Sequence, residues 1–219
     1  MSAPTPPTPG RRDGEGTRQK LLRAALELFT GEGFLASTTP IIAERAGVAE
    51  GTIYRHFSSK EHLLNEVFRG TQRWATGVVK ELDGDRTLKA PERLSRIARR
   101  FVETAERDPA GARMLLRQRD AKFLDPPSRD AAKEFRDALQ QVVAAGKADG
   151  LVRAGPAELW TSVWLVVLAF IIERVAAREW TADAPQVAQA IEAAWSAIAA
   201  PAPPAQGRTS SPEAPSAEG

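Results

Sequence analysis

The stretch STTPIIAERAGVAEGTIYRHFSSKEHL, residues 37–63, decides the fold of this chain. Apolar residues at helical spacing lie on both sides of Gly47, which predicts two short helices, over about 39–46 and 50–56, joined by a tight turn. A pair of this kind is a helix-turn-helix, in which the first helix braces on the core and the second enters the major groove of DNA. The sequence therefore predicts a helix-turn-helix over residues 37–56.

Helical periodicity divides the second helix into an inner and an outer face. Ile53 and Phe57, four residues apart, are expected to point back toward the first helix, and Val48 to close the turn. The remaining side chains are small or polar, as a surface that reads a groove requires. They are Glu50, Gly51, Thr52, Arg55 and His56, with Tyr54 at the edge.

These residue types match the contacts that a duplex offers. An arginine such as Arg55 can donate two hydrogen bonds to guanine, and a glutamate such as Glu50 can accept from the amine of cytosine. Gly51 allows the backbone to approach the duplex closely. Hydroxyl, imidazole and ammonium groups instead suit phosphate oxygens. The candidates for phosphate contacts are Thr38, Thr52, Tyr54, His56 and Lys60.

The rest of the chain is also predicted to be helical, because no stretch shows sustained strand alternation. We expect an all-α protein with a three-helix DNA-binding domain over 15–75 and a larger helical domain over 76–200. Prolines and glycines separate the helices. The further helices are expected over about 17–31, 59–80, 91–107, 110–123, 129–148, 156–178 and 185–199.

Composition narrows the class of protein. The chain has no cysteine and two histidines, so thiol chemistry and a multi-histidine metal centre are excluded. We predict no metal, no cofactor and no enzymatic activity, since no nucleophile, base and metal ligands converge. The net charge of +2 excludes a wholly basic coat protein but leaves room for a local basic face.

Neither end of the chain is rich in residues that can build a core. Residues 1–14 and 201–219 are rich in Pro, Gly, Ala and Ser, so we expect a disordered N-terminal arm and a disordered C-terminal tail. The arm lacks the apolar segment of a signal peptide. The longest apolar run, 159–172, is shorter than the roughly 20 residues that span a bilayer. A cytoplasmic protein without membrane contact is predicted.

The combination AGVxxGTIYxxFxSKExL, residues 46–63, resembles the DNA-binding domain of the TetR family of transcriptional regulators. The resemblance extends from Thr17 to about Arg69. It implies that the groove is faced by Glu50, Gly51, Thr52 and Arg55. It also implies that phosphate is held by Thr38 and Thr39 at the start of the first helix, and by Tyr54, His56 and Lys60.

Three positions qualify the resemblance. Pro40 matches a position that reaches a base in some members, but proline has no side-chain donor, so no base contact is assigned to it. Ala49 stands where the family often has serine, so the second helix lacks that cap, at a cost of about 1 kcal/mol. Glu50 brings a negative charge to the duplex, which either reads a base or weakens non-specific binding.

The helix over 156–178 is apolar on nearly all sides and must be covered on several of them. Together with the helix over 129–148 it forms a hairpin that could pair with its twin in a symmetric four-helix bundle. The alternative is the central core helix of a monomer. The resemblance implies the homodimer, whose recognition helices would lie about 34–36 Å apart and read a palindromic operator.

The resemblance also implies a regulator, most often a repressor, that releases DNA when a small molecule binds in the larger domain. A hydrophobic effector is expected, because pockets for such ligands are mostly apolar. The candidate lining residues are Trp74, Phe101, Met114, Phe123 and Trp164, each of which could instead be ordinary core. A helical protein-interaction module that has kept a DNA-like motif is the remaining alternative.

Overall fold

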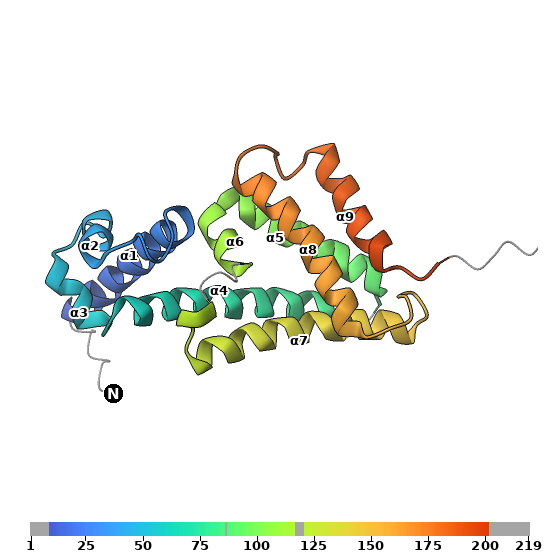
Figure 1. Cartoon of the computed structure of the whole chain (residues 1–219), viewed down its shortest axis with the longest axis horizontal. Helices are drawn as coiled ribbons and strands as arrows, with labels where there is room; N and C mark the ends of the chain where they lie inside the picture. The colour runs from blue at the N-terminus through green and yellow to red at the C-terminus, as the bar shows by residue number, and fades with distance from the viewer. Residues whose placement is uncertain (1–8, 86, 117–120, 202–219) are drawn as a thin grey trace, which may run out of the picture.

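The computed structural model describes residues 9–85, 87–116 and 121–201, and every regular element in these ranges is helical (Figure 1). An isolated antiparallel bridge joins Val152 to Ala199. The all-α prediction is therefore confirmed for this part of the chain. In chain order the elements are α1 (Pro9–Gly31), α2 (Thr39–Ala46), the 3-10 helix η1 (Glu50–Thr52), α3 (Ile53–His56), α4 (Lys60–Asp83), α5 (Ala90–Arg107), α6 (Pro109–Leu115), the 3-10 helix η2 (Ala121–Phe123), α7 (Pro126–Ala148), α8 (Ala157–Ala176) and α9 (Pro185–Ile198).

Two clusters of buried apolar side chains form the interior. The N-terminal cluster gathers α1, α2, α3 and the first half of α4, around Phe29, Ile42 and Phe57. The C-terminal cluster gathers the second half of α4 with α5–α9, around Phe101 and Trp164. Because α4 runs through both halves of the molecule (Figure 1), no linker separates them at the predicted boundary between residues 75 and 76.

The first helix is longer than predicted. α1 begins at Pro9 instead of near Thr17, so residues 9–14 of the expected disordered arm are helical. Extending an existing helix adds one hydrogen bond for each residue that is fixed, which makes extension easier than nucleation. The amide of Gln19 donates to Glu15 one turn earlier, at 2.7 Å, and supports this added segment. Residues 1–8 and 202–219 lie outside the described residues.

The predicted helix over 110–123 ends earlier than expected, since α6 ends at Leu115 and Phe123 belongs to the 3-10 helix η2. Residues 117–120, which the prediction also covered, lie outside the described residues. The ring of Phe123 packs on that of Phe34 with the centroids 4.5 Å apart, which places it against the N-terminal cluster. The contact joins residues 89 positions apart in the chain, so the local apolar pattern does not contain it.

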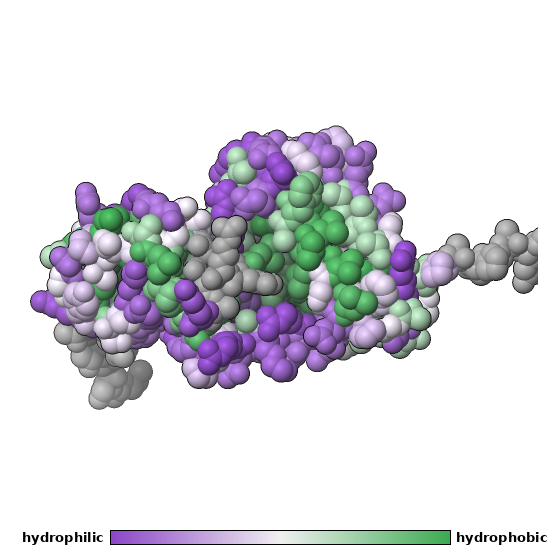
Figure 2. Space-filling view, viewed as in Figure 1, coloured by the Kyte–Doolittle hydropathy of each residue, from purple (hydrophilic) through white to green (hydrophobic). Residues whose placement is uncertain are grey.

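α8 is the most apolar helix, and its 20 residues are long and apolar enough to cross a membrane by length and composition alone. The argument from a short apolar run therefore fails. Its inner face, which includes Trp164 and Leu168, packs into the C-terminal core, and 39% of its most apolar window is buried. The outer face leaves apolar side chains in solvent, and Figure 2 shows them gathered over α8.

Candidate nucleic-acid interface

Gly47 makes the turn between α2 and the recognition segment, which consists of η1 and α3. Its φ of 68° lies in the left-handed region that glycine adopts without steric cost. The N–H of Gly47 donates to the carbonyl of Glu44, and the N–H of Val48 to that of Ala43, both at 3.0 Å. These bonds satisfy carbonyls at the end of α2, so the turn is closed as the sequence predicts.

The inner face of the motif is buried as predicted. Ile42, Ile53 and Phe57 are all at most 1% exposed and belong to the N-terminal cluster. The recognition segment is not one uniform helix, since it begins as the 3-10 helix η1 and becomes α-helical at Ile53. Ala49 precedes it without a side-chain cap, as expected from its missing hydroxyl.

The outer face of the recognition segment is available to a partner. Glu50, Gly51, Tyr54 and Arg55 are exposed, whereas Thr52 and His56 are partly buried. Within the described part of the chain, the side chains of Glu50 and Arg55 make no hydrogen bond or ion pair. Their charged groups are therefore free to bind base edges, which is the role predicted for them.

A polar hollow lies where the N-termini of α2 and α4 meet. The hydroxyls of Thr39 and Tyr54 are 3.2 Å apart at its rim. Helix N-termini carry free N–H groups and a partial positive charge, so phosphate is the natural ligand of such a place. The hollow has a volume of about 370 Å³ and is lined by Ser37, Thr38, Thr39, Tyr54, Ser58, Ser59 and Lys60.

Hydrogen bonds among Ser58, Ser59 and His62 stabilise the start of α4. Ser59 caps the helix by accepting from the N–H of His62 at 3.0 Å. The N–H of Ser58 donates to Nδ1 of His62 at 3.1 Å. No role for His62 follows from the motif, although its four-residue spacing from Ser58 is compatible with a contact across one helical turn. His62 thus helps to fix the edge of the hollow.

Lys60 has a structural role beside the predicted phosphate contact. Its ammonium donates to the carbonyls of Phe34 and Ser37 at 2.9 and 2.8 Å, and it lies 4.3 Å from the centroid of the Phe34 ring. An ammonium has three donors, so one remains for a phosphate. Lys60 therefore first ties the loop before α2 to the start of α4.

The predicted effector-pocket residues do not surround one cavity. Trp74 and Phe101 are neighbours, with ring centroids 5.5 Å apart, and Trp164 is buried in the same C-terminal cluster. Met114 and Phe123 instead pack with the N-terminal cluster. Helical spacing identified these residues as apolar packing positions, but it could not tell which of the two clusters each would join.

A different hollow, which we call the Gln72 hollow, lies between α4, α6, α7 and α8. It has a volume of about 200 Å³ and is lined mainly by apolar side chains such as Phe68, Leu115 and Phe135. Gln72 itself is 3% exposed, and its Nε2 donates to the carbonyl of Leu115 at 3.0 Å. That bond fixes the orientation of the amide. Among the described residues, its Oε1 has no hydrogen-bond partner.

The two halves of the molecule are joined by buried and partly buried ion pairs. Arg69 of α4, whose side chain is 10% exposed, pairs with Glu66 and with Asp125 at the start of α7. Glu66 also pairs with Arg18 of α1. The hydrogen bond from Arg69 holds the pKa of Glu66 below its usual value, although burial opposes this shift. The network links α1, α4 and α7 through charged groups.

Comparison with known proteins identifies both halves. Residues 21–67 match the profile of "Bacterial regulatory proteins, tetR family", and residues 72–200 match that of "Tetracyclin repressor-like, C-terminal domain". The transcriptional repressor KstR2 of Rhodococcus jostii is 32% identical over 163 residues, which cover 68% of this chain and 75% of that protein. KstR2 of Mycolicibacterium smegmatis is 30% identical over 155 residues, covering 67% and 72%.

Solved structures share the fold. A TetR-family regulator from Marinobacter aquaeolei superposes with a TM-score of 0.71 at 20% identity, over 87% of this chain and all of that chain (100%). FadR of Bacillus subtilis, solved with stearoyl-CoA, gives a TM-score of 0.66 at 22% identity, over 82% of this chain and 98% of that chain. The chain therefore belongs to the TetR family and is a DNA-binding transcriptional regulator, not an enzyme.

Proposed function

We propose that this regulator is a repressor that binds a palindromic operator as a homodimer and leaves it when an apolar effector binds in the C-terminal half. The observation that carries the proposal is the outer face of the recognition segment. The charged groups of its exposed Glu50 and Arg55 lack internal partners among the described residues, and the polar hollow at the starts of α2 and α4 lies next to it. Repression is supported by the KstR2 relatives, which are named repressors.

The chemistry of the side chains on this face decides which of them we propose to contact bases and which to contact phosphates. Arg55 and Glu50, with Gly51 and Thr52 beside them, lie in the groove and read base edges. Tyr54 and His56 hold phosphate from the edge of the segment. The remaining phosphate contacts of the proposal come from the hollow, through Thr38, Thr39 and Lys60.

The homodimer is supported by the outer face of α8. Leu159, Val166 and Phe170 are 48%, 70% and 48% exposed, a row of large apolar side chains that water disfavours (Figure 2). A two-fold axis beside α7 and α8 would let this face cover itself in a second copy. The same axis pairs two recognition segments, which a palindromic operator requires.

The effector site is proposed to include the Gln72 hollow. A buried carbonyl left without a donor costs about 1–3 kcal/mol, which a ligand bearing an N–H or O–H group would recover. The walls are otherwise apolar, so the rest of the ligand is expected to be apolar. Stearoyl-CoA, the ligand in the FadR structure, combines an apolar chain with amide donors and is a suitable first probe.

Release of DNA is proposed to run through α4. This helix carries Gln72 near its middle and begins beside the polar hollow, so a ligand that shifts it changes the spacing of the two recognition segments. A regulator of cellular promoters acts in the cytoplasm, which is the proposed location.

The test begins with selection of bound duplexes from a random pool, followed by affinity measurements over a range of salt concentrations. We expect a palindromic consensus, a dimer on the duplex, and a logarithm of affinity that falls steeply with the logarithm of salt concentration. A slope near zero would contradict the proposal and favour a protein-interaction module.

The effector claim has its own measurement. Apolar compounds, stearoyl-CoA among them, are screened for thermal stabilisation, and each hit is titrated in the presence of the selected operator. Hits are expected to lower operator affinity, and the variant Gln72→Met to weaken their binding by about tenfold. Hits that stabilise the protein but leave operator affinity unchanged at saturation would disprove the coupling.

A further inference from the structure

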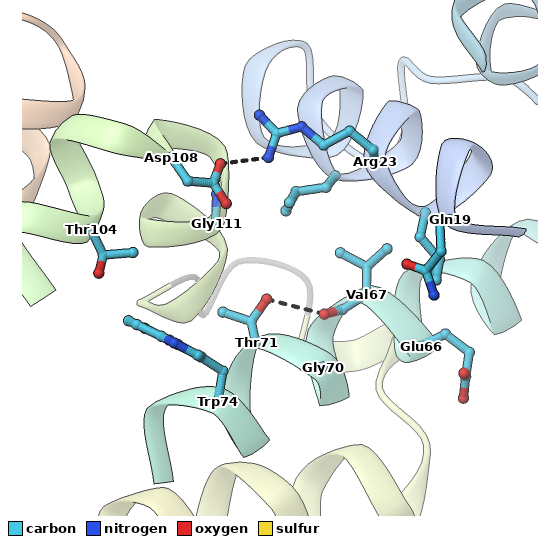
Figure 3. Close-up of a pocket in the computed structure, with 12 residues that line it drawn as sticks. Gln19, Arg23, Glu66, Val67, Gly70, Thr71, Trp74, Thr104, Asp108 and Gly111 are labelled. Atoms are coloured by element: carbon cyan, nitrogen blue, oxygen red, sulfur yellow. Dashed lines mark hydrogen bonds and ion pairs between the residues drawn. The ribbon is translucent and has the colours of Figure 1, made fainter. Parts of the chain in front are cut away.

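A second cavity lies where α1 meets α4, α5 and α6, and we call it the junction groove (Figure 3). Its volume is about 370 Å³, at the small end of the range for small-molecule sites. One wall comes from Leu22 and Leu26 of α1, and the other from Val67, Gly70 and Trp74 of α4. It shares no lining residue with the Gln72 hollow.

Gly70 and Trp74, one turn apart on α4, give the junction groove its shape. A Cβ atom at Gly70 would meet no other atom within 4 Å, so the absence of a side chain leaves open space there. Trp74 is 38% exposed and packs on Phe101. A glycine inside a helix costs about 1 kcal/mol of stability relative to alanine. Gly70 and Trp74 together leave a space in which a flat ring can lie beside the indole of Trp74.

The two threonine hydroxyls that line the junction groove offer lone pairs and not donors. The hydroxyls of Thr71 and Thr104 donate to carbonyls of their own helices at 3.1 and 2.8 Å. The amide nitrogen of Gln19 donates to Glu15 at 2.7 Å. The Gln19 amide keeps a second N–H, and the two hydroxyl oxygens and the Oε1 of Gln19 remain as acceptors. A ligand that satisfies them must bring an O–H or N–H group.

The charged side chains around the junction groove are already paired. Arg23 donates to Asp108 and to Glu27, both at 2.7 Å, and Figure 3 shows the pair with Asp108 at the edge of the cavity. Glu66 pairs with Arg18 and Arg69. A charged ligand would therefore be desolvated without gaining a free counter-ion, which favours a neutral ligand.

We propose that the junction groove binds a compact, neutral, planar ring compound that carries a hydroxyl or N–H donor. The ring lies against Trp74 above Gly70, and the donor meets the lone pairs of Thr71, Thr104 or Gln19. Because α1 forms one wall and α4–α6 the other, the ligand contacts both halves of the molecule and stabilises their relative orientation. This site is additional to the effector site of the proposed function.

The experiment uses the full chain labelled with 5-fluorotryptophan, which gives one ¹⁹F resonance for each of its 5 tryptophans. Loss of a resonance in Trp74→Phe assigns Trp74. Titration with 2-naphthol is expected to shift this resonance saturably. 2-Methoxynaphthalene, which lacks the donor, and 2-naphthoate, which is charged, are expected to bind at least about tenfold more weakly.

Matched variants at one position separate filling of the junction groove from other effects. Gly70→Leu places a branched side chain in the open space and is expected to abolish the shift. Gly70→Ala adds only a Cβ and should keep the affinity within about threefold, while making the helix more stable. Leu22→Phe narrows the groove from the opposite wall and checks the result should Gly70→Leu lose helical circular dichroism.

Three results would overturn the inference: no saturable shift of Trp74 in the unsubstituted chain, an equal shift in Gly70→Leu, or equally strong binding of 2-naphthoate. No DNA is present in this titration. Failure of operator binding would therefore contradict the proposed function without touching the junction groove, and failure of the titration would leave the proposed function intact.

Discussion

Arg69, in the middle of α4, donates to both carboxylate oxygens of Asp125 at the N-cap of α7, over distances of 3.0 and 2.7 Å. Asp125 also accepts from the N–H of Ser128 at 2.9 Å. One carboxylate thus caps a helix and neutralises a buried guanidinium. Because Arg69 also pairs with Glu66, whose second partner is Arg18 of α1, this contact connects the C-terminal hairpin to the DNA-binding half.

Replacing Asp125 by alanine is expected to lower the free energy of unfolding by about 2–3 kcal/mol. Loss of the cap accounts for about 1 kcal/mol, and the rest comes from leaving Arg69 buried with one partner fewer. The figure is below that of a fully buried pair because the Asp125 side chain is 38% exposed. Urea unfolding followed by circular dichroism measures the change.

Lys133→Ala, which removes an exposed ion pair with Asp137, is the control and should lower the free energy of unfolding by about 0.5 kcal/mol or less. Equal effects of the two changes would contradict this account.

The same network predicts how stability depends on pH. Arg69 holds the pKa of Glu66 below its usual value. Burial raises the pKa of Asp125, but the hydrogen bonds from Ser128 and Arg69 outweigh it and hold this pKa below its usual value too. Groups with a lowered folded pKa stabilise the fold above their unfolded pKa, about 4, and lose this contribution as the pH falls from there through the folded value.

Unfolding free energies measured between about pH 7 and pH 3 should therefore be level at first and fall below about pH 4 to 5. Glu66→Gln is expected to make this fall shallower, because glutamine does not titrate. Glu81→Gln, at an exposed carboxylate, should leave it unchanged. Identical acid slopes for Glu66→Gln and the unsubstituted chain would show that the network does not carry the pH dependence.

Two glycines of the motif are expected to respond differently to alanine. Gly47→Ala forces a Cβ into the left-handed region and should destabilise the protein by about 1–2 kcal/mol, although nothing lies within 4 Å of that Cβ. Gly51→Ala has open space and no positive φ, so stability should not change. Its methyl group lies on the outer face, and affinity for duplex DNA should fall. A stable Gly51→Ala variant with unchanged affinity would remove Gly51 from the interface.

Side chains that read bases and those that hold phosphate can be separated by sequence dependence. Arg55→Ala should relax discrimination at one base position by about 1–3 kcal/mol. Tyr54→Phe keeps the ring, loses the hydroxyl beside Thr39, and should weaken binding to every sequence by about 1 kcal/mol. Selection from a random pool measures both. An unaltered preference at every position in Arg55→Ala would disprove its base-reading role.

The outer face of α8 predicts a change in oligomeric state. Val166→Lys puts an ammonium at the centre of the apolar surface and should convert a dimer to a monomer in sedimentation velocity, with a large loss of operator affinity. Gln189→Lys adds the same charge to exposed α9 and is the control. A Val166→Lys protein that remains a dimer would place the interface elsewhere.

Local spacing was sufficient to predict the motif. Ile53 and Phe57 are buried because a four-residue spacing returns both to one helix face, and Gly47 marks the turn because only glycine adopts its φ readily. These features depend on residues within about two helical turns of each other, so the sequence alone contains them.

The remaining features depend on residues far apart in the chain. Lys60 donates to carbonyls 23 and 26 residues earlier, and no local pattern predicts such a contact. Met114 and Phe123 pack with the N-terminal cluster, which no local pattern predicts, and their place in an effector pocket stays a prediction. The Nε2 of Gln72 donates to the carbonyl of Leu115, 43 residues later, which leaves its Oε1 without a partner among the described residues. No local pattern predicts this arrangement.

The unbroken course of α4 has a mechanical consequence. Its 24 residues, at 1.5 Å each, form a rod of about 36 Å (Figure 1). The rod begins at the polar hollow and lines both the Gln72 hollow and the junction groove. A tilt of about 5° around its far end moves its beginning sideways by roughly 3 Å, close to the spacing of about 3.4 Å between successive base pairs. Under the proposed function, a small change in the angle of α4 would therefore alter the separation of the two recognition segments in a dimer by about one base-pair step.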